Sequence, residues 1–385
     1  MGYGFMYVAV NPEMLRWARE RAGRTVRDLA ASFPNLDQWE RGEKRPTLRQ
    51  VERFAKAVHA PVGYLFLPQP PVERVPIPDM RTAGNVRIER PSPDLLETIY
   101  VCQQRQEWYR DFARSAGEGP CSFVGSARIE DDVELTAARM RSALGMDLEE
   151  RRQIPTWSDA LRRFIQQADD LGILVMCSGV VLNNNRRRLD PEEFRGFAIA
   201  DEMAPLVFIN GADSRAAQMF TLAHELAHIW IGQSALSDAQ AIWLPDHKIE
   251  RWCNQVAAEL LVPLNVLSVD FRREAELRAE VERLARRYKV STLVILRRVY
   301  DIGGLTREQL RESYDAELER LHALPKQSGG NFYLTQAARV SRRFARALVT
   351  STLEGHTLYR DALRMLGFTR LATFHQLARS LGVMA

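Results

Sequence analysis

The segment from Thr221 to Trp230 carries two histidines and a glutamate at a spacing that can do chemistry. His224 and His228 are four positions apart, so a helix would place both imidazoles on one face, about 6 Å apart along its axis. Two imidazoles so placed can bind one cation, and Glu225 beside them can act on a water that the cation holds. This HExxH pattern is typical of zinc sites that activate water, although two histidines also occur on ordinary amphipathic helices.

A catalytic zinc needs a third protein ligand, and residues 249–263 offer two glutamates. An apolar residue recurs every three or four positions, which predicts a helix packed inward: Ile249, Trp252, Val256 and Leu260. Glu250 and Asn254 share a neighbouring stripe, which favours Glu250 as the metal ligand and Asn254 as a side chain that orients a ligand. Glu259 competes with Glu250, but nine positions further along a helix it points roughly to the opposite face.

Two more residues near this helix are weighed. Cys253 could bind zinc as a thiolate, but its apolar neighbours favour a place in the core. His247, in the loop before the helix, could donate to a developing oxyanion, although a lone loop histidine is more often solvated.

The strings Phe220–His228 and Glu250–Pro263 together resemble the ImmA/IrrE family of zinc metallo-endopeptidases. The similarity extends over residues 172–305. It implies a zincin-like (gluzincin) peptidase domain of α+β class, with a small β-sheet beside the HExxH helix. It also implies that His224, His228 and Glu250 are the zinc ligands. Glu225 is then the catalytic acid/base.

Members of this family typically cleave or control helix-turn-helix repressors or antitoxins. The resemblance therefore implies a protein substrate, such as a repressor, antitoxin or toxin, in a toxin–antitoxin, mobile-element or stress-response system. An extended substrate is expected to add to the edge of the sheet at Leu206–Asn210, since proteases commonly hold peptides as an added strand.

Residues 11–66 resemble the XRE (Cro/repressor-like) helix-turn-helix family, and Asn11 followed by Pro12 predicts the first helix start. The stretch between Leu29-Ala30 and Trp39-Glu40 is shorter than usual and contains a proline, so the recognition helix is predicted to be short or rebuilt. The candidate contacts to bases or phosphates are Asn35, Gln38, Arg41, Lys44 and Arg45. The alternative is a scaffold that docks on the peptidase or on a partner.

The carboxyl-terminal end is basic, with nine Lys or Arg against two Asp or Glu in residues 326–385. Four arginines at i, i+3, i+4 and i+7 predict one helix face that could meet an acidic partner or phosphate: Arg339, Arg342, Arg343 and Arg346. A solvated face is the alternative. This end also resembles the tail of longer family members, which are often encoded beside a toxin.

Length and composition define the organisation. With 385 residues, 46% hydrophobic and 26% charged, a mostly disordered chain is excluded. We expect a helix-turn-helix-like module at 8–68, a Pro-rich linker or extended wrap at 69–95, a peptidase domain at 96–310 (helical lead-in 96–170, catalytic core 171–305) and a helical module at 326–385.

The residue pattern also predicts the main elements. Strands are expected at 171–182, 196–200 and 206–210. Helices are expected at 94–114, 131–144, 156–171 and from an N-cap at Asp213 onward, with breaks near 233–247, Pro263, Gly303-Gly304 and 328–330.

No apolar run approaches the ~18 residues of a membrane span, and the opening residues do not form a secretion signal. Four isolated cysteines indicate a reducing compartment, so a cytoplasmic protein is expected. The favoured function is a regulatory zinc-dependent endopeptidase. The alternative is a DNA- and toxin-binding regulator or antitoxin whose zinc site is structural or inactive; a homodimer fits either, because repressor-like modules commonly dimerise.

Overall fold

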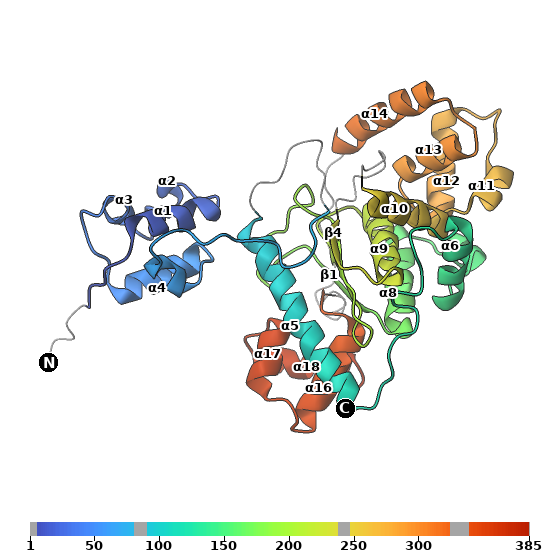
Figure 1. The fold of residues 1–385 in the computed structure, drawn as a ribbon. Coiled ribbons are helices and arrows are strands. Elements are labelled where there is room, and N and C mark those ends of the chain that lie inside the picture. Colours follow the sequence, from blue (N-terminus) through green and yellow to red (C-terminus); the bar gives the residue numbers. More distant parts are fainter. Residues whose placement is uncertain (1–5, 81–90, 238–246, 324–338, 385) are drawn as a thin grey trace. The chain divides into compact units, whose positions relative to one another are not determined.

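The computed structural model describes residues 6–80, 91–237, 247–323 and 339–384 (Figure 1). The chain divides into two compact units. Unit 1 contains residues 1–76 and 88–97, and unit 2 contains residues 77–87 and 98–385.

Unit 1 is built from short helices around an aromatic core. Its elements are α1 (Pro12–Arg21), α2 (Val26–Leu29), α3 (Leu36–Glu40), α4 (Leu48–Ala57) and the 3-10 helix η1 (Val62–Phe66). Asn11 caps α1 by accepting from the backbone of Glu13, and the predicted helix start is confirmed. Phe33 packs edge-on against Trp39 and Phe54 inside this core.

Helix α3, where a recognition helix would lie, has five residues. Pro34 stands two residues before it, and Leu36, Trp39 and Glu40 are buried in unit 1. Glu40 pairs there with Arg19 of α1 at 2.7 Å. The prediction of a short helix is therefore confirmed, and most of its side chains serve the core.

Unit 2 contains a sheet whose described strands run in the order β1-β3-β2-β4. These are β1 (Leu174–Ser178), β2 (Gly196–Ile199), β3 (Leu206–Asn210) and β4 (Ala235–Ser237). β1 is parallel to β3, while β2 is antiparallel to both β3 and β4. The predicted pairing of 196–200 with 206–210 is confirmed, and the strand expected at 171–182 is shorter than predicted.

The strand order overturns one expectation about the substrate. β3 lies in the interior of the sheet, with both its sides hydrogen-bonded to β1 and β2, so no peptide can add at Leu206–Asn210. β4 is the terminal strand beyond β2, and its Leu236 forms a parallel bridge with Asp79. Strand order depends on tertiary pairing, which an apolar run in the sequence does not reveal.

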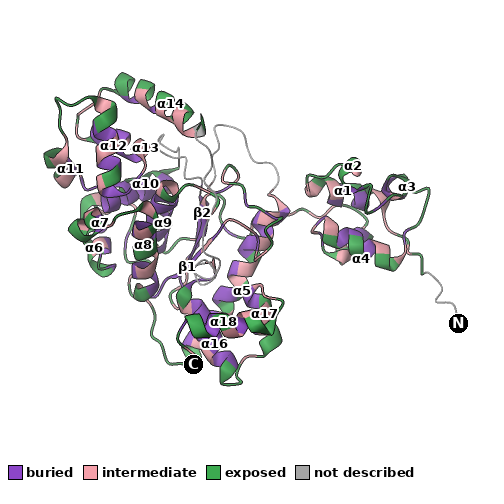
Figure 2. Ribbon diagram, turned by 180° about the vertical axis from the view of Figure 1, so that it is seen from behind, coloured by how far each residue is buried: buried purple, intermediate pink, exposed green. Residues whose placement is uncertain are grey.

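The two faces of the sheet are covered by different helices. Val175, Val207 and Ile209 belong to the core that also contains side chains of α8 (Trp157–Leu171) and α9 (Arg215–Trp230). On the other face, Phe197 stacks on Phe208, and Cys102 of α5 (Pro93–Ser115) contacts Met176. Every residue of β2 and β3 is buried, and the strands around the β2 label are purple in Figure 2.

Further helices support the α9 side of the sheet. They are α6 (Val133–Ala143), α7 (Leu148–Gln153), α10 (Lys248–Leu261), α11 (Leu264–Asp270), α12 (Leu277–Tyr288), α13 (Thr292–Asp301) and α14 (Arg307–Ala323). Breaks at Pro263 and at Gly303-Gly304 lie where predicted, while the predicted break at 328–330 and most of that at 233–247 lie outside the described residues.

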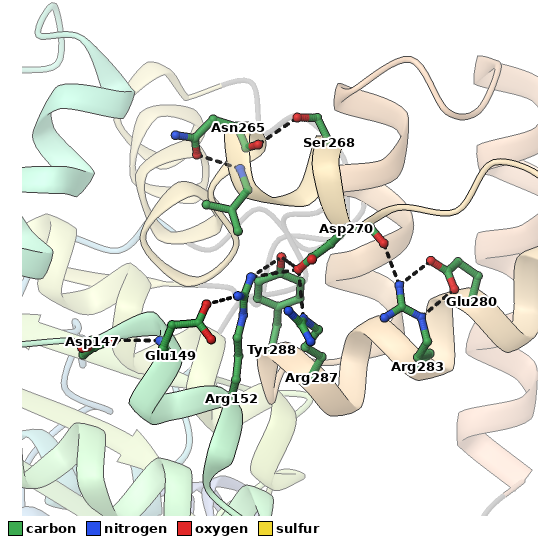
Figure 3. Close-up of polar contacts among 11 residues, drawn as sticks. Asp147, Glu149, Arg152, Asn265, Ser268, Asp270, Glu280, Arg283, Arg287 and Tyr288 are labelled. Carbon is green, nitrogen blue, oxygen red and sulfur yellow. Dashed lines mark hydrogen bonds and ion pairs between the residues drawn. The ribbon is translucent and has the colours of Figure 1, made fainter.

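A polar cluster joins three of these helices (Figure 3). Asp270 at the end of α11 accepts from Arg152 of α7 at 2.8 Å, and from Arg287 and Tyr288 of α12 at 2.9 and 2.5 Å. Burial raises the pKa of Tyr288 to about 12, so its hydroxyl stays a donor. The cluster fixes α7 and α11 against α12.

The carboxyl-terminal helices α16 (Arg342–Leu353), α17 (Tyr359–Leu366) and α18 (Leu371–Ser380) are part of unit 2. The carbonyl of Met365 accepts from buried Arg105 of α5, and the carbonyls of Leu366 and Gly367 accept from Asn183. The end of α17 is thus tied by hydrogen bonds to the body of unit 2.

The prediction of one arginine stripe is wrong in this part of the chain. α16 begins at Arg342 after Ser341, whose φ of +66° turns the backbone, so Arg339 does not share its helix. Arg339 donates to Asn183, and Arg343 to Tyr109 and Glu118. Arg342 and Arg346 remain exposed.

Candidate metal centre

Helix α9 carries the HExxH string through the middle of unit 2. Ser214, one residue after the predicted Asp213, is its N-cap and accepts from the backbone of Ala217. Every residue from Gln218 to Trp230 is buried, between the sheet and α10. A helix buried on all sides holds its side chains in fixed rotamers, which suits a metal centre.

The three predicted ligands converge. The Nε2 atoms of His224 and His228 lie 3.1 Å apart, and each lies close to a carboxylate oxygen of Glu250, at 3.2 and 3.1 Å. One ligand atom from each side chain lies within 4.8 Å of the others, and the three residues are at most 2% exposed. Such a set of two imidazoles and a carboxylate, brought together from α9 and α10, can hold one metal ion.

Burial and mutual contact set the charges of this cluster. Burial alone would raise the pKa of Glu250, but the two histidines outweigh it and hold that pKa below its ordinary value. Burial lowers the pKa of His228, which favours the neutral imidazole that a metal requires. For His224, burial also opposes the charged form, but Glu250, Glu225 and a hydrogen bond with Asn254 raise its pKa overall.

Glu225 lies beside the three ligands and is completely buried. Burial raises the pKa of its carboxyl to about 8, an effect that His224 opposes and Glu250 reinforces. Among the described residues, neither of its oxygens has a hydrogen-bond donor at full bonding geometry, although the Ser237 hydroxyl lies near enough to lower its pKa. A buried carboxylate without a donor at bonding geometry is costly, so its oxygens fit a centre that can hold a cation and a water.

Asn254 lies one turn after Glu250 on α10, as predicted, and its hydrogen bond with His224 is the contact expected of a residue that orients a ligand. Glu259 faces elsewhere: its carboxylate pairs with buried Arg298 and accepts from the backbone of Leu264. This arrangement is consistent with the prediction that Glu250 and Glu259 point to opposite faces of the helix.

The other two residues weighed near the centre also have clear positions. Cys253 is completely buried, and burial raises the pKa of its thiol well above the ordinary value. His247 is exposed at the start of α10. Its part in oxyanion stabilisation stays a prediction.

Two residues that sequence reasoning missed border the centre. A side chain at Gly196 of β2 would put its Cβ 2.5 Å from Thr221 Cγ2 and 3.1 Å from Glu225 Oε1. Ser237 of β4, paired with Gly196, is buried and has its Oγ 3.4 Å from His228 Nε2. A glycine at a strand position is itself a sign of close approach, but nothing near Ser237 in the sequence marked it.

The candidate DNA contacts belong to unit 1. Gln38, Arg41, Lys44 and Arg45 are exposed, and Asn35 is half-buried. Arg41 is paired with Asp37 at 2.7 Å and with Glu43 at 2.9 Å, so local acids offset its charge.

Comparison with known families places the centre in a class. Residues 168–300, which include β1 to β4 and the two helices that carry the candidate ligands, match the peptidase M78 family, described as an IrrE N-terminal-like domain. This match supports a metallopeptidase, as the resemblance of the two strings implied. Residues 340–380 match a domain of unknown function (DUF8813). A comparison with curated proteins gives no match, and no described helix is long and apolar enough to cross a membrane.

Proposed function

We propose that this chain is a zinc-dependent endopeptidase. The observation that carries the proposal is the convergence of His224, His228 and Glu250 beside the orphaned carboxylate of Glu225. Two imidazoles and one carboxylate suit zinc better than magnesium or manganese, and three protein ligands leave the fourth position that hydrolysis requires.

The residues have separate parts in this proposal. A bound zinc would acidify a water and polarise the peptide carbonyl. Glu225 accepts the proton that the attacking water loses and returns it to the leaving amine. Asn254 keeps His224 oriented.

We further propose that the substrate is a regulatory protein of the repressor, antitoxin or toxin type. This part rests on the family resemblance, on the repressor-like pattern of unit 1 and on the basic helices that follow the peptidase domain. It predicts limited cleavage at one or a few bonds rather than general degradation. The product of the neighbouring gene is the first substrate to test.

A second function is favoured by one observation. The side chains of His224, Glu225 and His228 are completely buried, so a peptide cannot reach them in this conformation. A DNA- and toxin-binding regulator that uses the zinc site only for structure would need no such access.

The substitution Glu225→Gln separates the two. It keeps the three ligands, so zinc content measured by mass spectrometry should equal that of the wild type, while substrate cleavage should fall by at least about 1000-fold. Chelation should abolish cleavage, and added zinc should restore it. Equal cleavage by the variant would contradict the peptidase proposal. A wild-type protein that binds zinc but cleaves no product of a neighbouring gene would support a zinc site that serves only the structure.

A further inference from the structure

The terminal strand next to the metal centre already has a neighbour from the same chain. Leu236 of β4 donates from its backbone N–H to the carbonyl of Pro78 at 2.8 Å, and its carbonyl accepts from the N–H of Met80 at 2.9 Å. Asp79 between them forms a parallel bridge with Leu236. On its other side β4 pairs with β2, so both edges of β4 are occupied at this residue.

This edge is the part of the sheet from which an extended peptide would reach the centre. Ser237, the residue after Leu236, has its Oγ 3.4 Å from His228 Nε2. The opposite terminal strand, β1, is three strand spacings away, about 14 Å, and packs against α16. A substrate strand held by backbone hydrogen bonds therefore belongs on β4.

We propose that residues 77–80 form an internal plug: they occupy the β4 edge that a peptide substrate must take, and the peptidase acts only when they leave. The inference rests on the proposed function, and it states how the access of substrate to the proposed peptidase centre is regulated. His224, Glu225 and His228 are completely buried, so a working peptidase must open the centre, and release of the plug would free the strand beside it.

The plug is built to block an edge and to be released. Ile77 is buried, whereas Pro78 and Asp79 are exposed, and the contacts that hold the segment include this apolar anchor and two backbone hydrogen bonds. Pro76 and Pro78 have no N–H, and proline and exposed charge are the features that stop a strand edge from pairing further. A longer peptide that pairs with all of β4 would form more backbone hydrogen bonds than the plug does, and could therefore displace it.

The position of the plug in the chain connects it to unit 1. Just before it, Glu73 accepts from Arg21 of α1 at 2.5 and 2.7 Å, and the first segment of unit 1 ends at Pro76. The plug begins with the next residue. A macromolecule that binds unit 1 and shifts this segment would therefore draw the plug away from β4.

Two substitutions test the plug independently in the full, zinc-loaded chain. Met80→Pro removes the N–H that donates to Leu236, and Ile77→Ser removes the buried anchor. Val72→Ser is the matched control, because Val72 is 83% exposed and precedes the plug. Hydrogen exchange of the Leu236 amide reports whether the plug has left, since Pro78 is its acceptor.

Substrate access is measured separately with fluorescein-labelled, denatured casein. Binding is measured in a Glu225→Gln background and cleavage in chains that keep Glu225. Both plug variants should speed exchange at Leu236 and tighten casein binding about tenfold, with a matching rise in cleavage, and Val72→Ser should change none of these.

The outcomes distinguish the two proposals. Faster exchange with unchanged casein binding would overturn the plug, because the freed edge would then not be the substrate edge. Unchanged exchange in both variants would overturn it as well. Faster exchange with tighter binding, but no cleavage by any zinc-loaded variant, would support the plug and contradict the peptidase function.

Discussion

At the residue scale, Gly196 sets the space around Glu225, because a glycine has no side chain. β2 crosses α9 at Gly196, where a Cβ would lie 2.5 Å from Thr221 Cγ2 and 2.9 Å from the Phe208 carbonyl. These atoms belong to a buried helix and an interior strand, neither of which can shift cheaply.

We therefore expect Gly196→Ala to lower the free energy of unfolding by about 1–3 kcal/mol, the usual cost of overpacking a core. It should also weaken zinc binding, because the added methyl pushes on Glu225 and on the helix that carries both histidines. Urea unfolding and zinc competition with a chelator measure the two effects. Gly119→Ala is the control, since its Cβ would meet nothing within 4 Å; equal effects of the two substitutions would contradict this account.

The two glutamates of α10 give a second prediction at this scale. Glu250→Gln should weaken zinc binding by more than about 100-fold, because it removes a ligand rather than an outer partner. Glu259→Gln should leave zinc binding unchanged and cost about 2 kcal/mol of stability, because it removes one of the two carboxylates that pair with buried Arg298 and leaves only Asp301, at 3.3 Å. Zinc affinity and metal-free urea unfolding of both variants check this. Loss of zinc in the Glu259 variant would revive it as a ligand.

At the element scale, helix length decides what unit 1 can read. A recognition helix brings several side chains to base edges in the major groove. α3 has five residues, three of them buried, and leaves Asp37 and Gln38 exposed. One of these is an acid, which phosphates repel.

We therefore expect unit 1 to contribute only weak, sequence-independent DNA binding, through the exposed charges of Lys44 and Arg45. A gel shift with the promoter of the gene and with scrambled DNA of equal length should give the same weak complex, lost by about 0.2 M salt. A promoter-specific complex that survives this salt would show that the shortened helix still reads bases.

At the scale of the whole molecule, the carboxyl-terminal helices are built into unit 2 through a buried carboxylate. Asp169 of α8 accepts from Ser341 Oγ at 2.8 Å and from the backbone of Arg342 at 3.1 Å, where α16 begins. It also accepts from the backbone of Val175 in β1. Burial raises its pKa to about 6, although these donors act in the opposite direction.

This carboxyl gives a prediction for pH. Because the folded chain holds the Asp169 proton more tightly than the unfolded chain does, its contribution to stability is full below pH 3.8, the ordinary pKa, and is lost as pH rises through about 6. The loss amounts to about 3 kcal/mol. Asp169→Asn should lack this decline, so urea unfolding from pH 4 to 7 should show the difference between wild type and variant shrinking by that amount. The exposed neighbour Asp170, changed to Asn, should leave the decline in place.

The sequence by itself determined the parts of this protein that depend on neighbours along the chain. A helix fixes which residues share a face, so the spacing of His224 and His228, and of Glu250 and Asn254, predicted the cluster that the structure shows. The Asn11-Pro12 start and the breaks at Pro263 and Gly303-Gly304 were likewise predicted from local residue types.

Tertiary structure alone decided what depends on partners far apart in the sequence. An apolar run looks alike in an interior and a terminal strand, so the position of β3 and the pairing of residues 78–80 with β4 could not be read from it. Ser341 looks like any helix cap, yet its bond to Asp169, 172 positions away, breaks the expected arginine stripe. Local helical periodicity thus determined which residues can act as candidate metal ligands. Long-range strand pairing determined whether a peptide can approach them.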